Sequence, residues 1–143
     1  MQVNIYLENS IRGAKVKQGR AMYLLECLID GRPYTKHQII ELENCSRNMI
    51  ELEALIEALQ RMQKRSEIRI FTCNDSIYGT LNNMWKIQWK KNDWINARGN
   101  KVKNWEQWQK VTDLLENFSY VVTKEEHSYR KWMQTQLGGI KNV

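Results

Sequence analysis

The spacing of apolar residues changes along the chain between a two-residue and a helical period. Residues 2–7 (QVNIYL) alternate polar and apolar side chains, which predicts a β-strand. The apolar run at residues 21–29 ends at Asp30-Gly31, a dipeptide typical of hairpin turns. A second strand at residues 21–29 would therefore pair with a third at residues 34–42, and the three segments predict an antiparallel meander.

From residue 48 to residue 64, apolar side chains recur every three or four positions, which predicts an amphipathic helix capped by Ser46. The later predicted elements are a strand at 67–73, helices at 76–91 and 103–116, a strand at 118–123 and a helix at 125–137. The order β-β-β-α-β-α-α-β-α predicts an α/β fold, a mixed five-stranded sheet with helices on both faces. The length of 143 residues suits a single domain over residues 1–143.

Composition narrows the choice of partner and location. The net charge of +6 favours an anionic partner such as nucleic acid. No apolar run approaches the ~18 residues of a membrane span and no signal-peptide pattern is present, so we expect no membrane contact. Three cysteines without a metal-binding spacing suit free thiols in a reducing cytoplasm. No spare apolar face marks an interface, so we expect a monomer.

Tryptophans and positive charges concentrate at residues 84–108, which hold five of the six tryptophans and six of the 22 basic residues. Trp85 and Trp89 are four positions apart on a predicted helix, and we expect both in the core. Six basic side chains cannot all be buried, and Asp93 is the only acid among residues 84–105. This segment therefore predicts a basic surface that meets phosphates. Its basic residues are Lys86, Lys90, Lys91, Arg98, Lys101 and Lys103.

Three acidic residues stand where a carboxylate is costly or functional. Glu51 falls at the edge of the apolar stripe of its helix, one turn before Leu55, where burial requires compensation. Glu8 ends the first strand and Asp75 joins a strand to a helix, positions at which sites of α/β sheets gather. Asp75 would also suit a helix cap. Three converging carboxylates suit a divalent metal such as Mg²⁺ or Mn²⁺.

The order of these motifs matches a known family. The segments are Glu8-Asn9-Ser10, Asn48-Met49-Ile50-Glu51-Leu52, Asn74-Asp75-Ser76-Ile77-Tyr78, and the run Trp85, Trp89, Lys90-Lys91, Trp94, Ala97, Val102-Lys103-Asn104, Trp108. They resemble the ribonuclease HI family, whose pattern is a strand ending in DGS, then N-x-M-E-L, T-D-S-x-Y and a tryptophan- and lysine-rich basic protrusion. The resemblance covers roughly residues 2–137, with the basic protrusion at about residues 84–104.

The resemblance implies an endonuclease that hydrolyses the RNA strand of RNA–DNA hybrids with two Mg²⁺ or Mn²⁺ ions about 4 Å apart. By position, the metal ligands would be Glu8, Glu51 and Asp75. Asn48 matches a residue that touches the hybrid in the minor groove, where 2′-hydroxyls identify RNA. The implied nucleic-acid-binding residues are Asn48, Lys86, Lys90, Lys91, Trp94, Arg98, Lys101, Lys103 and Asn104.

Departures from the family pattern leave alternatives open. The first acid is Glu8 rather than aspartate, and Asn9 replaces the following glycine. One extra methylene moves the carboxylate by roughly 1 Å, a scale at which a rate can fall ~10²-fold. A long glycine-containing loop before the last helix is also missing. The second hypothesis is therefore a catalytically impaired nucleic-acid-binding module, or a nuclease acting on another nucleic-acid structure.

No aspartate opens the last predicted helix, where the family has its fourth acid. Alignment from Arg130-Lys131 brings His127 to that position. Alignment from the preceding strand instead makes His127 match the family's loop histidine, which is thought to help the product leave. Helix phase favours Glu125 or Glu126 as a third option. We therefore expect a catalytic set of Glu8, Glu51, Asp75 and His127, with the role of His127 open.

Overall fold

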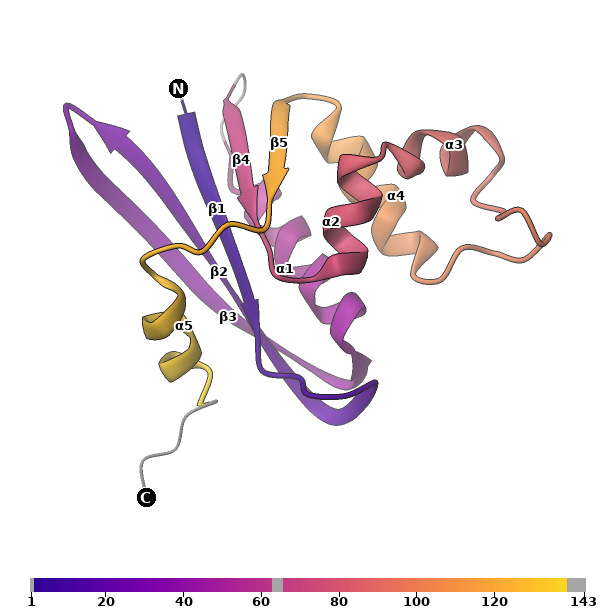
Figure 1. Ribbon diagram of the computed structural model, residues 1–143, viewed down its shortest axis with the longest axis horizontal. Helices are drawn as coiled ribbons and strands as arrows, with labels where there is room; N and C mark the ends of the chain where they lie inside the picture. The colour runs from indigo at the N-terminus through magenta and orange to yellow at the C-terminus, as the bar shows by residue number, and fades with distance from the viewer. Residues whose placement is uncertain (1, 63–65, 139–143) are drawn as a thin grey trace.

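Five strands form one mixed sheet in the computed structural model of the chain, which describes residues 2–62 and 66–138. The strand order is β3-β2-β1-β4-β5 (Figure 1). Strands β1, β2 and β3 form the predicted antiparallel meander, and β4 and β5 run parallel to β1. The elements are β1 (Gln2–Asn9), β2 (Lys15–Ile29), β3 (Arg32–Ser46), α1 (Arg47–Gln60), β4 (Glu67–Phe71), α2 (Asp75–Asn82), α3 (Trp85–Lys91), α4 (Trp105–Leu115), β5 (Ser119–Thr123) and α5 (Arg130–Gln136).

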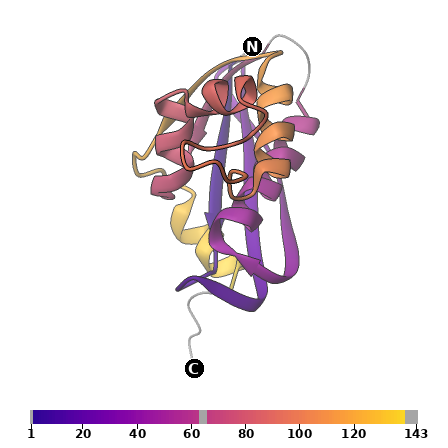
Figure 2. The ribbon, with the colours of Figure 1, turned by 90° about the vertical axis from the view of Figure 1, so that its right-hand side faces the viewer.

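Helices cover both faces of the sheet, as the sequence predicted. The larger core joins the sheet to α1 and α4, with Ile5 from β1 and Leu55 from α1 among its buried residues. On the other face, Met133 and Leu137 of the α5 region pack against Tyr6 and its neighbours. Figure 2 shows α1 and α4 on one side of the strands and α5 on the other. The side-chain alternation along β1 is what supplies apolar groups to both cores.

The hairpin of β2 and β3 is longer than the apolar pattern predicted. Its turn lies at Asp30-Gly31, whose φ angles of 53° and 77° are both positive, as the dipeptide indicated. The polar residues 15–20 are nevertheless strand, since Lys15 pairs with Ser46 at the far end of the ladder. Backbone pairing along the whole hairpin here outweighs the lack of apolar alternation.

Helix boundaries were predicted less well than helix positions. Ser46 caps α1 as expected, because its side chain accepts a hydrogen bond from the Met49 amide. The helix ends at Gln60, and the predicted residues 63–64 lie outside the described part of the chain. One helix over 76–91 is wrong: the left-handed Met84, with φ of 60°, separates α2 from α3. The last helix begins at Arg130, five residues later than predicted.

None of the helices within residues 2–62 and 66–138 has the length and hydrophobicity needed to cross a membrane. The carboxyl ends of the parallel strands β1, β4 and β5 meet at one edge of the sheet, next to the start of α1. Residues 8–9, 72–75 and 124–127 follow or end these strands. Side chains far apart in the sequence therefore converge at this edge.

Candidate active site

Glu8 is a buried carboxylate at the end of β1, with 4% of the residue exposed. Residues of α5 and the preceding loop hold it from the face opposite to α1. Gln134 Nε2 donates to its Oε1 at 2.7 Å, and His127 Nε2 lies 3.1 Å from its Oε2. Arg130 Nε lies 3.8 Å from Oε1. These contacts fix both oxygens of Glu8 in place.

His127 is fixed by aromatic rings as well as by Glu8. Its ring lies 4.5 Å from the ring of Tyr6 and 5.9 Å from that of Phe71, measured between centroids. The side chain is 5% exposed, and its Nδ1 is buried with no hydrogen-bond partner. The structure thus brings His127 onto Glu8, whereas its catalytic role stays a prediction.

The two alternatives to His127 lie outside the site cavity. Glu126 accepts a hydrogen bond from Arg130 Nη1, and its side chain is 78% exposed. Glu125 is also exposed. Neither lines the cavity that contains Glu8.

Glu51 is buried on α1, with 2% of the residue exposed, and its position at the edge of the apolar stripe anticipated this. Asn9 Nδ2 donates to its Oε1 at 2.6 Å, and Thr72 Oγ1 donates to its Oε2. Burial raises the pKa of Glu51; the two hydrogen bonds and the charge of Arg47 act in the opposite direction. Asn9, a departure from the family pattern, therefore has a defined task that a glycine could not perform.

Glu8 and Glu51 line one cavity of about 280 Å³. Asp75 does not line it: its side chain is 82% exposed and forms an ion pair with Lys124, whose hydrogen bond and charge lower the pKa of Asp75. Asn74 rather than Asp75 caps α2. The other cavity residues are Leu7, Asn9, Ile11, Arg12, Gly13, Arg47, Cys73, Arg130 and Gln134.

The three predicted metal ligands do not form a closed cluster. Within residues 2–62 and 66–138, no group of three or more His, Cys, Asp or Glu side chains lies close enough to hold a metal ion. Glu8 and Glu51 share a cavity, and Arg47 interacts electrostatically with both Glu51 and Asp75. The structure therefore brings two of the acids together and leaves the third nearby, on an exposed side chain.

Two of the predicted nucleic-acid contacts are buried, so their expected exposure is wrong. Lys86 is 6% exposed, with Nζ 5.5 Å from the ring centre of Tyr120, and burial lowers its pKa. Trp94 is 5% exposed and belongs to the main core, because the loop after α3 folds back toward α4. Trp85, which we expected in the core, is instead 48% exposed. The break at Met84 turns α3 and changes which of its residues face outward.

The remaining predicted contacts divide into paired and free groups. Lys90 Nζ lies 2.5 Å from Glu116 Oε1 and 3.1 Å from Asp113 Oδ1, and these contacts raise its pKa. Its charge is therefore already compensated within the protein. Asn48, Lys103 and Asn104 line one hollow beside α1 and α4. The exposed cations that follow α3 or end it are Lys91, Arg98, Lys101 and Lys103. Figure 1 shows this segment at the end of the molecule farthest from α5.

Sequence reasoning missed Arg130 and Gln134, the two α5 residues on Glu8. The spacing from His127 to Arg130 and then to Gln134 is three and four positions, which places all three on one helical face. That face lies beside the apolar one made by Met133 and Leu137. A search for polar residues in phase with His127 would have found them.

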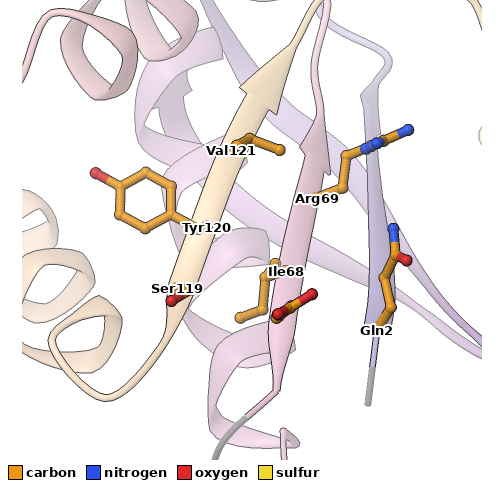
Figure 3. Close-up of a pocket in the computed structure, with 7 residues that line it drawn as sticks. Gln2, Ile68, Arg69, Ser119, Tyr120 and Val121 are labelled. Carbon is orange, nitrogen blue, oxygen red and sulfur yellow. The ribbon is translucent and has the colours of Figure 1, made fainter.

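Another hollow, of about 350 Å³, lies at the opposite, amino ends of β1, β4 and β5 (Figure 3). It contains Arg69 but only one acid, Glu67, and no histidine. The paired buried carboxylates make the cavity at the carboxyl edge the better candidate for catalysis.

Comparison with known proteins agrees with this assignment. Ribonuclease H of Clostridium botulinum (strain Hall) is 34% identical over 74 residues, which are 52% of this chain and 50% of that relative. Ribonuclease H of Thermoanaerobacter sp. (strain X514) is 25% identical over 116 residues, 80% of this chain and 71% of that relative. The chain spans about half the length of the first relative.

Solved structures show the same fold. LC9-RNase H1, described as a type 1 RNase H with the type 2 active-site motif, has a TM-score of 0.76 at 18% identity, covering 96% of this chain and 72% of its own. LC11-RNase H1 in complex with RNA/DNA hybrid has a TM-score of 0.59 at 15% identity, covering 92% of each chain. The family model for RNase H matches residues 1–130. The chain therefore belongs to the RNase H family.

Proposed function

We propose that this protein hydrolyses the RNA strand of RNA–DNA hybrids with the help of a divalent metal, Mg²⁺ or Mn²⁺. The observation that carries the proposal is the pair of buried carboxylates, Glu8 and Glu51, facing one cavity at the carboxyl edge of the sheet. Membership of the RNase H family supports the reaction, and the hybrid bound to LC11-RNase H1 supports the substrate.

The donor set suits a hard cation. We assign Glu8, Glu51 and Asp75 as the residues that would hold it, because carboxylate oxygens are preferred ligands of Mg²⁺ and Mn²⁺. Gln134 Oε1 is buried without a hydrogen-bond partner, and the same side chain donates to Glu8. When bound, a divalent cation supplies Lewis acidity at the phosphate and lowers the pKa of a water.

The chain's own side chains prepare the two buried carboxylates. Gln134 and His127 hold one carboxylate, on Glu8, and Asn9 and Thr72 hold the other, on Glu51. Such supporting contacts orient ligands, and their loss typically costs 10- to 100-fold in metal affinity or activity. We therefore assign these four residues to positioning.

The exposed cations Lys91, Arg98, Lys101 and Lys103 would hold the backbone of the hybrid. Lys103 shares a hollow with Asn48 and Asn104, which places a cation beside two amides that can reach sugar hydroxyls or base edges. Lys86 and Trp94 are left out of this surface because both are buried.

Lys103→Ala is expected to weaken hybrid binding and to reduce the slope of log Kd against log salt by about one. Lys90→Ala is the matched control, because Asp113 and Glu116 already compensate the charge of Lys90. Fluorescence anisotropy of a labelled hybrid between 50 and 300 mM salt (roughly, the range over which phosphate contacts are most sensitive) measures both. Equal slopes for wild type and Lys103→Ala would remove Lys103 from the interface.

A second candidate function is hybrid binding without efficient cleavage. The observation that favours it is that protein partners already occupy all three acids: Glu8 contacts His127 and Gln134, Glu51 accepts two hydrogen bonds, and Asp75 is paired with Lys124. A cation would have to displace or share some of these partners.

The test is cleavage of a labelled RNA–DNA hybrid by the purified protein in Mg²⁺ and in Mn²⁺, beside Asp75→Asn. Because Asp75 is exposed, this substitution should not disturb the fold. RNA-strand cleavage that Asp75→Asn loses supports the proposal. Binding of an uncut hybrid in both metals would leave the binding function instead. The three free cysteines support a cytoplasmic location, where thiols stay reduced.

A further inference from the structure

Three arginine side chains line the same cavity as Glu8 and Glu51. They come from separate places in the chain: Arg12 from the loop after β1, Arg47 from the first position of α1, and Arg130 from the first position of α5. Three guanidinium groups against two carboxylates leave a formal charge of 3 − 2 = +1 for the lining residues. Burial also raises the pKa of Glu51, which makes the lining still less negative.

Two of these charges are not used inside the protein. Arg130 is paired with Glu126 and reaches toward Glu8. In the part of the chain that the structure describes, neither Arg12 nor Arg47 forms an ion pair, and both are exposed. Arg47 affects Glu51 and Asp75 only through longer-range electrostatics. The cavity therefore has two free guanidinium groups at its rim and a third, partly engaged, at its wall.

We propose that Arg12, Arg47 and Arg130 form a phosphate-binding site that grips a backbone phosphodiester of nucleic acid without a metal. This inference rests on the proposed function, since it adds a group that seats the substrate in the same cavity. A guanidinium group binds two phosphate oxygens at once and keeps its charge at any physiological pH. The cavity of about 280 Å³ is several times the ~30 Å³ that one water occupies in the liquid, so a phosphate group fits.

The arrangement accounts for a peculiarity of this site. Glu8 and Glu51 already have protein hydrogen-bond donors, so the cavity does not depend on a cation to keep its carboxylates apart. Arginines facing the cavity then supply the positive charge that a phosphodiester needs in order to approach two carboxylates. Arg47 lies between Glu51 and Asp75 in its electrostatic influence, which puts it nearest the predicted reaction centre.

The experiment measures binding of a labelled RNA–DNA hybrid in EDTA, so that no metal takes part. The double variant Arg12→Ala/Arg47→Ala is compared with Arg69→Ala, which removes an equally exposed arginine from the hollow in Figure 3. We expect about 10-fold weaker binding for each cavity arginine removed, and a fall of about one per arginine in the slope of log Kd against log salt. Arg69→Ala should bind like wild type. Thermal unfolding checks that all variants are folded.

Binding of the double variant within twofold of wild type would overturn the proposal. Inorganic phosphate provides a further arm: stabilisation of wild type but not of the double variant, with unchanged hybrid binding, would assign the site to free phosphate and also overturn it. Equal losses for hybrid and DNA duplex support it, because a phosphodiester is common to both. Since the assay needs no metal and no cleavage, a failure of the proposed nuclease activity leaves this result readable.

Discussion

Glu51→Gln is expected to cleave hybrid at least about 100-fold more slowly than wild type and yet to be more stable. The activity should fall because glutamine offers one neutral oxygen where the carboxylate offers two charged ones, and even the partners of metal ligands are worth 10- to 100-fold. Stability should rise because Glu51 is buried, with 2% exposed, and an isosteric neutral group avoids the cost of burying a charge. Asn9 and Thr72 can both reorient to pair with an amide.

The stability gain should depend on pH in a defined direction. Burial raises the pKa of Glu51, so the folded protein binds a proton more tightly than the unfolded chain does. Glu51 therefore costs stability at neutral pH, and the cost disappears as the pH falls below about 4, where the group is protonated in both states. One pKa unit corresponds to ~1.4 kcal/mol, or an increase in Tm of about 4 °C for a chain of this size.

Thermal unfolding of wild type and Glu51→Gln at pH 4 and pH 7, together with hybrid cleavage in Mn²⁺, measures both effects. Glu53→Gln is the matched control on the same helix, because Glu53 is only half-buried and does not line the cavity. Cleavage by Glu51→Gln within threefold of wild type would show that Glu51 is not a ligand. A Tm difference that is the same at both pH values would show that its burial carries no cost.

Periodic patterns predicted the frame of the fold and the burial of one catalytic candidate. The two-residue period of β1 and the helical period of α1 follow directly from which face is buried. Because Glu51 sits at the edge of that helical stripe, its burial was readable from the sequence alone. The Asp30-Gly31 turn was readable for the same kind of reason, since its backbone angles demand those residue types.

The break between α2 and α3 was not readable, because it depends on residues other than glycine in the left-handed region. Met84 and Trp94 both have positive φ, of 60° and 62°. Such conformations are unfavourable for these residue types and persist only where surrounding contacts impose them. The burial of Trp94 and Lys86 follows from the same local path, so the expected basic surface lost two of its members.

The wall of the site formed by α5 was missed for a different reason. The search looked for a fourth acid, whereas the structure supplies Gln134 and Arg130 around Glu8. The longer side chain of Glu8 reaches these partners across the sheet edge, so the glutamate that departs from the family pattern is matched by a changed helix. Substitutions that compensate one another are visible only when the contacts between distant segments are known.

Met133→Ala is expected to lower the free energy of unfolding by about 2–5 kcal/mol, the usual cost of removing a large buried side chain. Met133 is fully buried in the smaller core, where it packs α5 against the sheet beside Tyr6. Hybrid cleavage should fall as well, because Gln134 follows Met133 directly and holds Glu8 only while α5 stays docked.

Met84→Ala is the control for the Met133 substitution, since Met84 is 51% exposed and should change the stability by about 0.5 kcal/mol or less. Urea unfolding of both variants, with single-turnover cleavage at a temperature where each is fully folded, separates stability from activity. If folded Met133→Ala cleaves at the wild-type rate, docking of α5 does not position Glu8. The contacts of Gln134 with Glu8 would then serve stability alone, and the reacting groups would have to lie on the α1 side of the cavity.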